Sequence, residues 1–236
     1  MGIKVISTSR YIAMNKQILI PLLFSAFILS ACSTVSLPIN PVTDKPVKQT
    51  DASEVKNTDD PIADMADTKR GLISEPIADA LTRVTKKPFG IKISPKNSPV
   101  NPEKFTGYHT GTDFETFPEE QDSDVQIHAI CDGPLLLKKY STGYGGVAVQ
   151  KCVVENSDIT VIYGHLKLDS ITSKTRDNLI AGEQIGVLGK GYSTETDGER
   201  KHLHLGIHKG TAINILGYVQ TESQLDNWID AMTLLK

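Results

Sequence analysis

The sequence shows no excess of basic residues. Its 236 residues include 25 Lys and Arg against 28 Asp and Glu, which gives a formal net charge of -3 at pH 7. Domains that bind nucleic acid through its phosphates usually carry a basic patch or stripe. We therefore expect no nucleic-acid partner, and we expect no electrostatic attachment to anionic lipid.

The N-terminus also has no apolar run that is long enough to cross a bilayer. Ile18–Leu29 spans about 12 residues, whereas a membrane-spanning helix needs about 20. Basic residues precede this run and small residues follow it, which is the order found in secretion signals. We therefore expect residues 1–31 to form a signal peptide, with translation beginning at Met1 or at Met14.

A cysteine closes this signal, in the order Leu29-Ser30-Ala31-Cys32. These residues resemble the lipobox of bacterial lipoproteins. The resemblance implies cleavage before Cys32 and acylation of its thiol and amine, and several acyl chains anchor a protein stably in a membrane. We expect a lipid-anchored protein of the cell envelope, on the periplasmic face of the outer membrane. The alternative is an ordinary signal peptide followed by an incidental cysteine.

Aromatic residues are absent between Phe27 and Phe89. Prolines interrupt this interval, and Asp, Lys, Thr, Ser and Asn are frequent in it. A segment of this composition cannot bury enough apolar surface to offset its conformational entropy. Residues 32–70 are therefore predicted to be a flexible tether that leads to a domain at residues 71–236. A segment that folds on a partner is the alternative.

Cysteine is scarce as well, with three residues in the chain. Acylation of Cys32 leaves Cys131 and Cys152, each of which falls in a candidate strand. An oxidising compartment permits a disulfide between them, and closing this loop would stabilise the fold by about 3 kcal/mol in the chain-entropy model. Two buried free thiols are the alternative.

No long helical period interrupts the chain between residues 88 and 217, where short apolar runs alternate with glycine turns. This pattern predicts a mainly β domain, with an antiparallel sheet or a barrel-like sandwich. The candidate strands are Ile91–Ser94, Thr112–Phe117, Val125–Cys131, Leu135–Tyr140, Gly146–Glu155, Thr160–Leu166, Gln184–Leu188 and His202–Lys209. Short flanking helices are expected at Ser74–Val84 and Gln224–Leu235, because apolar residues recur there at helical spacing.

Histidines alternate with apolar residues in the candidate strand His202–Lys209. Because successive side chains of a strand point to opposite faces, the apolar residues would face the core. His202, His204 and His208 would then share the other face. Neighbouring imidazoles can bind a metal ion and transfer protons. A surface strand that happens to be rich in histidine is the alternative.

Two further stretches place a histidine in an extended segment. His109 and Asp113 lie four residues apart and would face the same side, which Gly111 keeps open. Both are suitable zinc ligands. Tyr163 and His165 would likewise share a face at the end of an apolar strand. Each stretch alone has little specificity.

Together and in this order, these stretches resemble the lysostaphin/LytM-type zinc metallopeptidases of the duplicated-hybrid-motif superfamily. The resemblance extends from about Pro88 to Leu216. The motifs that carry it are Tyr108–Phe114, Ala129–Gly133, Ile162–Leu166, Ile180–Gly189 and Lys201–Leu205. It implies the mainly β, antiparallel fold of the LytM type.

The resemblance also implies a role for five residues. His109, Asp113 and His204 would hold one Zn²⁺ per chain, and His165 and His202 would flank it as catalytic groups. Three protein ligands leave a fourth position open, as in catalytic zinc sites. The implied activity is a zinc-dependent endopeptidase that hydrolyses the peptide cross-links of bacterial peptidoglycan with zinc-activated water. Peptidoglycan peptide stems are therefore the expected partner.

Two alternatives share this fold. Some relatives lack the ligands and activate cell-wall amidases by binding them, although all five positions are present here. The second alternative is a latent enzyme whose own segment, Ser94–Phe105, covers the metal.

Some residues depart from the family pattern. Gly206 stands where many members carry a glutamate, so a contact behind the metal ligands is expected to be missing. Arg200 and Lys201 lie in a loop that is more charged than in relatives, and they are interpreted as solvated or as a site for a substrate carboxylate. His128 and His208 match no ligand position and are interpreted as structural or surface residues.

Overall fold

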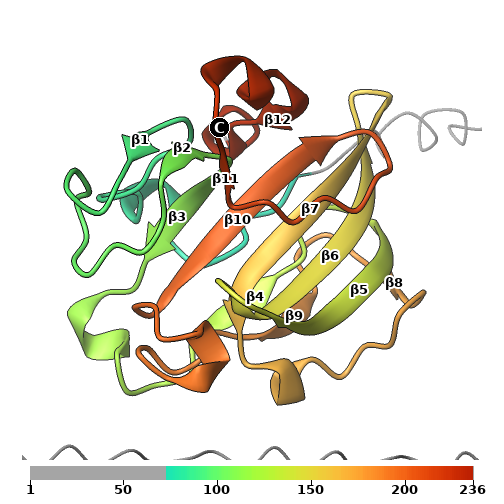
Figure 1. The fold of residues 1–236 in the computed structure, drawn as a ribbon. Coiled ribbons are helices and arrows are strands. Elements are labelled where there is room, and N and C mark those ends of the chain that lie inside the picture. The colour runs from blue at the N-terminus through green and yellow to red at the C-terminus, as the bar shows by residue number, and fades with distance from the viewer. Residues whose placement is uncertain (1–72, 236) are drawn as a thin grey trace, which may run out of the picture. The chain divides into compact units, whose positions relative to one another are not determined.

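The computed structural model describes residues 73–235, in which twelve short strands and six 3-10 helices form (Figure 1). The strands are β1 (Lys92–Ile93), β2 (Gly107–His109), β3 (Gly111–Glu115), β4 (Gln126–His128), β5 (Gly133–Ser141), β6 (Gly145–Val154), β7 (Ser157–Leu166), β8 (Asn178–Leu179), β9 (Gln184–Val187), β10 (His202–Lys209), β11 (Tyr218–Val219) and β12 (Trp228–Ile229). The helices are η1 (Ala80–Thr82), η2 (Pro118–Glu120), η3 (Leu168–Ser170), η4 (Thr194–Thr196), η5 (Glu222–Asn227) and η6 (Ala231–Thr233). The predicted mainly β, antiparallel fold is confirmed.

The N-terminal expectations lie outside these residues. They are the signal peptide at residues 1–31, the acylated Cys32 and the tether at residues 32–70. Within residues 73–235, no helix is long and apolar enough to cross a membrane.

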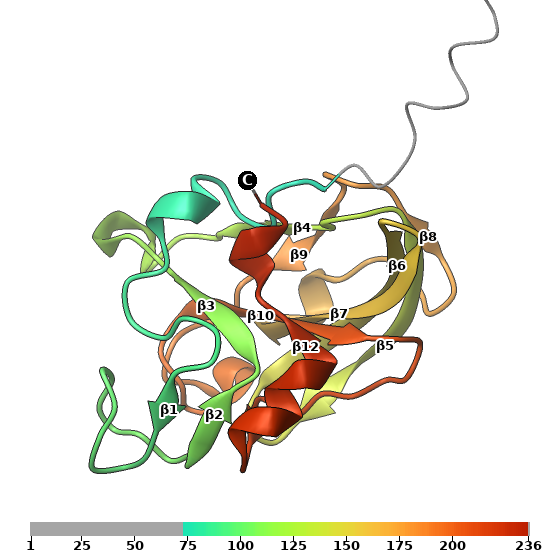
Figure 2. The ribbon, with the colours of Figure 1, turned by 90° about the horizontal axis from the view of Figure 1, so that it is seen from above.

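The largest sheet has seven strands, and β10 has three partners in it (Figures 1 and 2). The strand order is β12-β10-β7-β6-β5-β8, with β3 as an additional partner of β10, and all pairs are antiparallel. β7 therefore runs along one edge of β10, while β3 and β12 follow one another along the other edge. Two smaller sheets, β1-β2-β11 and β4-β9, complete the described part of the chain.

The two faces of β10 meet different surroundings. Leu203, Leu205 and Ile207 are at most 1% exposed and belong to the main core. His202 and His204 alternate with them and are buried on the opposite face. A second, smaller apolar cluster on that opposite face consists of Tyr144, Val147, Val149, Ile162 and Trp228. Each fully buried aliphatic side chain contributes about 1.5–3 kcal/mol, so the apolar alternation fixes the face that the histidines take.

The short helix expected at Ser74–Val84 is found only in part, at Ala80–Thr82. This part is the 3-10 turn η1, and Asp79 before it adopts the left-handed region at φ 56°. Just beyond this turn, the carbonyl groups of Arg83 and Lys87 accept hydrogen bonds from backbone N–H groups of β3. These bonds satisfy backbone N–H groups along one edge of β3. Pairing with the sheet therefore outweighs the local tendency to form a longer helix, which the spacing of apolar residues predicts.

The helix expected at Gln224–Leu235 is wrong, because the chain there forms η5, β12 and η6. β12 pairs with the end of β10, where Trp228 lies opposite His208. An open strand edge leaves backbone groups unpaired, and β12 closes the part of the β10 edge that β3 does not reach. Trp228 and Leu235 are buried, as the apolar stripe predicts, but in a different backbone conformation.

Candidate metal centre

β10 and β3 bring two of the predicted ligands face to face. His204 lies opposite Asp113 in the antiparallel register. Side chains at opposite positions of such a pair share one face, with their Cβ atoms about 5 Å apart. The alternation that sends Leu203 and Leu205 into the core therefore places His204 against Asp113.

The third predicted ligand, His109, ends β2, and Gly111 begins β3. Gly111 lies directly beneath the ring of His204. A Cβ atom added to Gly111 would be 2.6 Å from both Cε1 and Nε2 of His204. Glycine is therefore required here, in agreement with the expectation that Gly111 keeps this side open.

Three ligand atoms converge at this point. His109 Nε2 lies 3.0 Å from His204 Nδ1 and 3.2 Å from Asp113 Oδ1, and the latter two atoms are 3.1 Å apart. Two ligands of a tetrahedral zinc ion, each about 2.0–2.1 Å from it, are about 3.3 Å apart. The cluster therefore has the dimensions that a single ion requires. No other His, Cys, Asp or Glu of residues 73–235 belongs to this group.

The outer nitrogen of each ligand histidine has a hydrogen-bond partner. His109 Nδ1 lies 3.2 Å from the Pro88 carbonyl oxygen, and His204 Nε2 lies 3.2 Å from the Tyr144 hydroxyl. A proton on each outer nitrogen leaves the inner nitrogen unprotonated, which is the usual arrangement of metal-binding histidines. Burial, opposed by the contact with Asp113, lowers the pKa of His204 to about 4, so this ring is neutral at pH 7.

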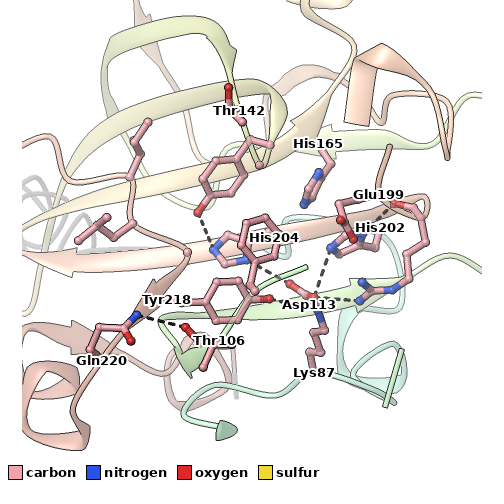
Figure 3. Close-up of a pocket in the computed structure, with 17 residues that line it drawn as sticks. Lys87, Thr106, Asp113, Thr142, His165, Glu199, His202, His204, Tyr218 and Gln220 are labelled. Atoms are coloured by element: carbon pink, nitrogen blue, oxygen red, sulfur yellow. Dashed lines mark hydrogen bonds and ion pairs between the residues drawn. The ribbon is translucent and has the colours of Figure 1, made fainter. Parts of the chain in front are cut away.

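Asp113 supplies the negative charge of the cluster. Burial alone would raise the pKa of its carboxyl group, but the neighbouring His202 and His109 hold that pKa well below its usual range. Its second oxygen, Oδ2, lies 2.9 Å from Arg200 Nη2. The same oxygen lies 3.2 Å from His202 Nε2 (Figure 3). The two oxygens of this carboxylate therefore have separate sets of partners.

His165 reaches the same site through an irregularity in β7. Its φ of 64° is left-handed, and the register between β6 and β7 shifts next to it. The expectation that Tyr163 and His165 share a face is wrong, because this conformation reverses the alternation. Tyr163 lies in the main core, whereas His165 lines a pocket beside His202, with their ring centroids 4.2 Å apart.

The protonation state of His165 follows from its surroundings. Burial, together with the nearby His202, lowers its pKa well below the ordinary value. Its Nδ1 has no hydrogen-bond partner among the described residues. The site therefore contains a neutral imidazole in addition to the ligand group.

Residues 107–215, which contain the three ligand positions together with His165 and His202, match the description "Peptidase family M23". The chain contains a peptidase M23 domain. The resemblance to the LytM-type zinc metallopeptidases is confirmed. M23 peptidases are zinc-dependent, and the cluster of this M23 domain fits one such ion.

Several solved structures resemble the M23 domain. Csd3 from Helicobacter pylori shares 23% sequence identity over 64% of this chain and 36% of that chain, with a TM-score of 0.40. A zinc containing peptidase from Vibrio cholerae is 21% identical over 70% of this chain and 40% of that chain, with a TM-score of 0.42. LytU is 22% identical over 64% of this chain and 83% of that chain, also with a TM-score of 0.42. This chain thus spans less than half the length of the first two proteins. Among curated protein sequences, none matches it significantly.

A pocket of about 290 Å³ opens over the cluster of the M23 domain (Figure 3). His165 and His202 line it, as do the aromatic residues Phe105 and Tyr218. These two aromatic rings stack with their centroids 5.2 Å apart. Phe105, the last residue of the segment Ser94–Phe105, therefore lines the pocket, and this segment supplies no atom to the ligand group.

Two cations that the sequence assigns to a charged loop are buried in the M23 domain. Arg200 is 8% exposed and pairs with acidic residues of β3. The Lys201 ammonium group donates hydrogen bonds to three carbonyl groups in the loop Glu120–Ser123. Arg200 and Lys201 are therefore neither solvated nor free to bind a substrate carboxylate, and both interpretations of these residues are wrong. The alternation of side chains along β10, extended two residues back from His202, predicts that Arg200 lies on the same face as His202 and His204.

Tyr144 contacts the ligand residue His204, and the sequence alone does not predict this contact. It lies in the turn between β5 and β6, and its hydroxyl contacts Nε2 of His204. A Cβ atom on Gly206 would approach the same nitrogen to 3.4 Å. Gly206 itself supplies no side-chain contact, as expected, and Tyr144 provides the partner of this nitrogen from another part of the chain.

His208 and His128 lie outside the ligand group. The ring of His208 packs edge-on against Trp228, with centroids 4.9 Å apart. His128 is in β4, which pairs with β9 in a separate sheet. Both positions agree with the structural interpretation of these residues.

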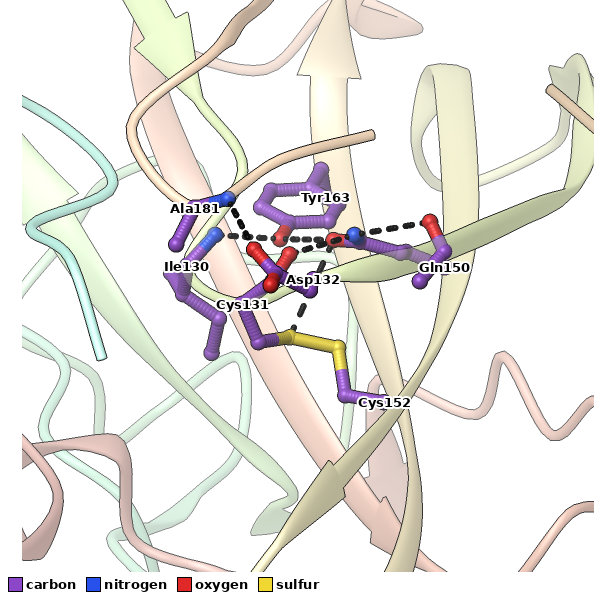
Figure 4. The surroundings of a disulfide bond; sticks show 8 residues. Ile130, Cys131, Asp132, Gln150, Cys152, Tyr163 and Ala181 are labelled. Carbon is purple, nitrogen blue, oxygen red and sulfur yellow. Dashed lines mark hydrogen bonds between the residues drawn. A yellow bond between two sulfur atoms is a disulfide. The ribbon is translucent and has the colours of Figure 1, made fainter. Parts of the chain in front are cut away.

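Cys131 and Cys152 form a disulfide bond, with their Cα atoms 6.1 Å apart (Figure 4). Gln150 Nε2 donates to the Cys131 carbonyl group at 2.7 Å, and the Tyr163 hydroxyl donates to Gln150 Oε1 at 2.8 Å. The N–H group of Ile130 donates in turn to the Tyr163 hydroxyl at 2.9 Å. The bridge and these buried bonds belong to the main core, on the face of the sheet opposite to the metal ligands.

Proposed function

We propose that the protein is a zinc-dependent endopeptidase that hydrolyses peptide cross-links of bacterial peptidoglycan. The observation that carries this proposal is the convergence of His109, Asp113 and His204 in one buried cluster, with His165 and His202 beside it in a pocket. A module that only binds a partner requires neither a complete ligand set nor two additional imidazoles at that point.

The ligand group would hold one Zn²⁺, and the two remaining histidines would handle protons. When bound, zinc polarises a carbonyl group and lowers the pKa of water to about 7. His202 is oriented by its Nδ1, which lies 2.9 Å from the Arg200 carbonyl oxygen. His165 is neutral and can accept a proton and return it to the leaving amine. Their rings are in contact, so both lie within reach of one substrate group.

The substrate and the location are inferred from the family and from the N-terminal sequence. A lipid on Cys32 and a tether at residues 32–70 would hold the domain in the cell envelope, at the periplasmic face of the outer membrane. The peptidoglycan lies within reach of such a tethered enzyme. The pocket, with Phe105 and Tyr218 along its wall, offers apolar contacts to a peptide stem.

Zinc content and cleavage products of the purified protein test this proposal. We expect about one zinc ion per chain, and mass spectra should show shortened muropeptides after digestion. His204→Ala and Asp113→Ala should remove both the bound zinc and the cleavage. His165→Ala should remove cleavage and retain zinc, because His165 is not in the ligand group. Full activity in His204→Ala would refute the site.

The same measurements separate the alternatives. A catalytically inactive protein that binds and activates a cell-wall amidase would release no peptide fragments and would increase amidase products in a mixed reaction. A latent enzyme covered by Ser94–Phe105 would gain activity when this segment is removed.

A further inference from the structure

Arg200 lies at the metal-ligand cluster without belonging to it. It precedes His202 by two residues, and its guanidinium group contacts two carboxylates of β3 at once. Nη2 is 2.9 Å from Asp113 Oδ2 and 2.5 Å from Glu115 Oε1, and Nε is 2.9 Å from Glu115 Oε2. The register of β3 against β10 explains this arrangement, because Glu115 lies opposite His202 and Asp113 lies opposite His204.

Arg200 and Glu115 form an ion pair that is buried in the domain. Arg200 and Glu115 are each 8% exposed. The cost of removing two charges from water often equals or exceeds their mutual attraction, so a buried ion pair is weak support for a fold. Both oxygens of the Glu115 carboxylate contact the guanidinium group, Oε1 at 2.5 Å from Nη2 and Oε2 at 2.9 Å from Nε. Glu115 is therefore placed to balance the charge of Arg200.

The two carboxylate oxygens of Asp113 have different partners. Oδ1 faces His109 Nε2 and His204 Nδ1 at 3.1–3.2 Å. Oδ2 is engaged by Arg200, and also by His202 Nε2 at 3.2 Å. A carboxylate without such partners can turn and present both of its oxygens to a metal ion.

We infer that Arg200, with its charge balanced by Glu115, is a positioning residue that restricts Asp113 to a single metal-binding oxygen. This inference rests on the proposed metal site. Its consequence would be that Oδ2, held by Arg200 and His202, does not compete with water or substrate for a bound zinc ion. Glu115 would neutralise part of the positive charge of Arg200, so that Arg200 weakens the attraction between Asp113 and a bound metal ion less.

Arg200→Lys tests this role while keeping the positive charge. A lysine has one ammonium group and lacks the fork that contacts Asp113 and Glu115 together. We expect zinc affinity, measured by competition with a chromophoric chelator, to fall about 10–100-fold, as is typical when a residue behind a metal ligand is replaced. With Co²⁺ in place of zinc, the visible absorption should weaken, because a second oxygen of Asp113 raises the coordination number.

Arg83→Lys is the matched control. Arg83 is 2% exposed, pairs with Glu120, and donates to the backbone carbonyl of Glu115, but it does not contact Asp113. This variant should lose stability and keep the zinc affinity and cobalt spectrum of the wild type. A purely structural role for Arg200 predicts the same result for Arg200→Lys, so wild-type affinity and spectrum in that variant would overturn the inference.

Glu115→Gln provides a second test that keeps Arg200 in place. We expect lower zinc affinity, because the positive charge of Arg200 is no longer balanced and weakens the attraction of Asp113 for the ion. The cobalt spectrum should stay unchanged, because Arg200 still holds Oδ2. If Arg200→Lys does not fold, Glu115→Gln decides the question, and unchanged zinc affinity in it would overturn the inference. A wild-type protein that binds no zinc would instead refute the proposed function itself.

Discussion

At Gly111 the backbone passes so close to the ring of His204 that no side chain fits. Gly111→Ala should therefore displace the ring, since the added Cβ atom would be 2.6 Å from two of its atoms. We expect at least a tenfold loss of zinc affinity, measured by chelator competition, because ligand atoms must keep their distances within a few tenths of an ångström.

Gly206→Ala is the control for this substitution. Gly206 lies on the same face of β10, but its added Cβ would meet its neighbours at 3.4–3.5 Å, which is ordinary contact. This variant should bind zinc as the wild type does. Equal zinc affinity in Gly111→Ala and Gly206→Ala would contradict the close approach of Gly111 to His204.

Single residues of the site differ in how far the sequence predicts them. His109, Asp113 and His204 stand in motifs whose spacing and residue types resemble a known family. Tyr144 is 60 positions away from His204, and Arg200 is 87 positions away from Asp113. The contacts of Tyr144 and Arg200 depend on strand register and turn geometry, which no local pattern records.

Among the elements, length decides what the sequence reveals. β10 has the predicted bounds, because eight residues of strict alternation define both a strand and its buried face. β2, β11 and β12 have two or three residues and show no period. The expected helix at Gln224–Leu235 fails for the same reason, since an apolar stripe fits both a helix and the short strand that closes the edge of β10.

Trp228 joins β12 to the apolar cluster on the histidine face of the sheet. It is 4% exposed and packs in the cluster that includes Val147, Val149 and Ile162. Trp228→Ala should lower the free energy of unfolding by about 3–5 kcal/mol, as is typical for removal of a buried aromatic side chain. Denaturant unfolding of the metal-free protein measures this change.

The comparison residue for Trp228 is Ile213, which is 50% exposed. Ile213→Ala should change the free energy of unfolding by about 0.5 kcal/mol or less, as for most surface positions. A loss of less than about 1 kcal/mol in Trp228→Ala would show that the cluster beneath the site does not support the fold.

For the described domain as a whole, the disulfide joins two cysteines of the main core that are 21 positions apart in the sequence. Reduction of the bridge should destabilise the protein by about 3 kcal/mol in the chain-entropy model. The bridge lies on the face of the sheet opposite to the ligands, so zinc affinity of the folded protein should stay the same. Unfolding curves and chelator competition, each with and without a thiol reductant, check both expectations. A parallel loss of zinc affinity on reduction would mean that the two faces are coupled.

The pairing of β3 with β10 also determines when the ligand group can assemble. Asp113 and His204 are 91 positions apart in the chain and meet only through this pairing. Contacts between distant segments form slowly, because closing the intervening loop costs conformational entropy. An unfolded chain therefore has no assembled ligand group. The ligand group can therefore assemble only when this long-range strand pair forms.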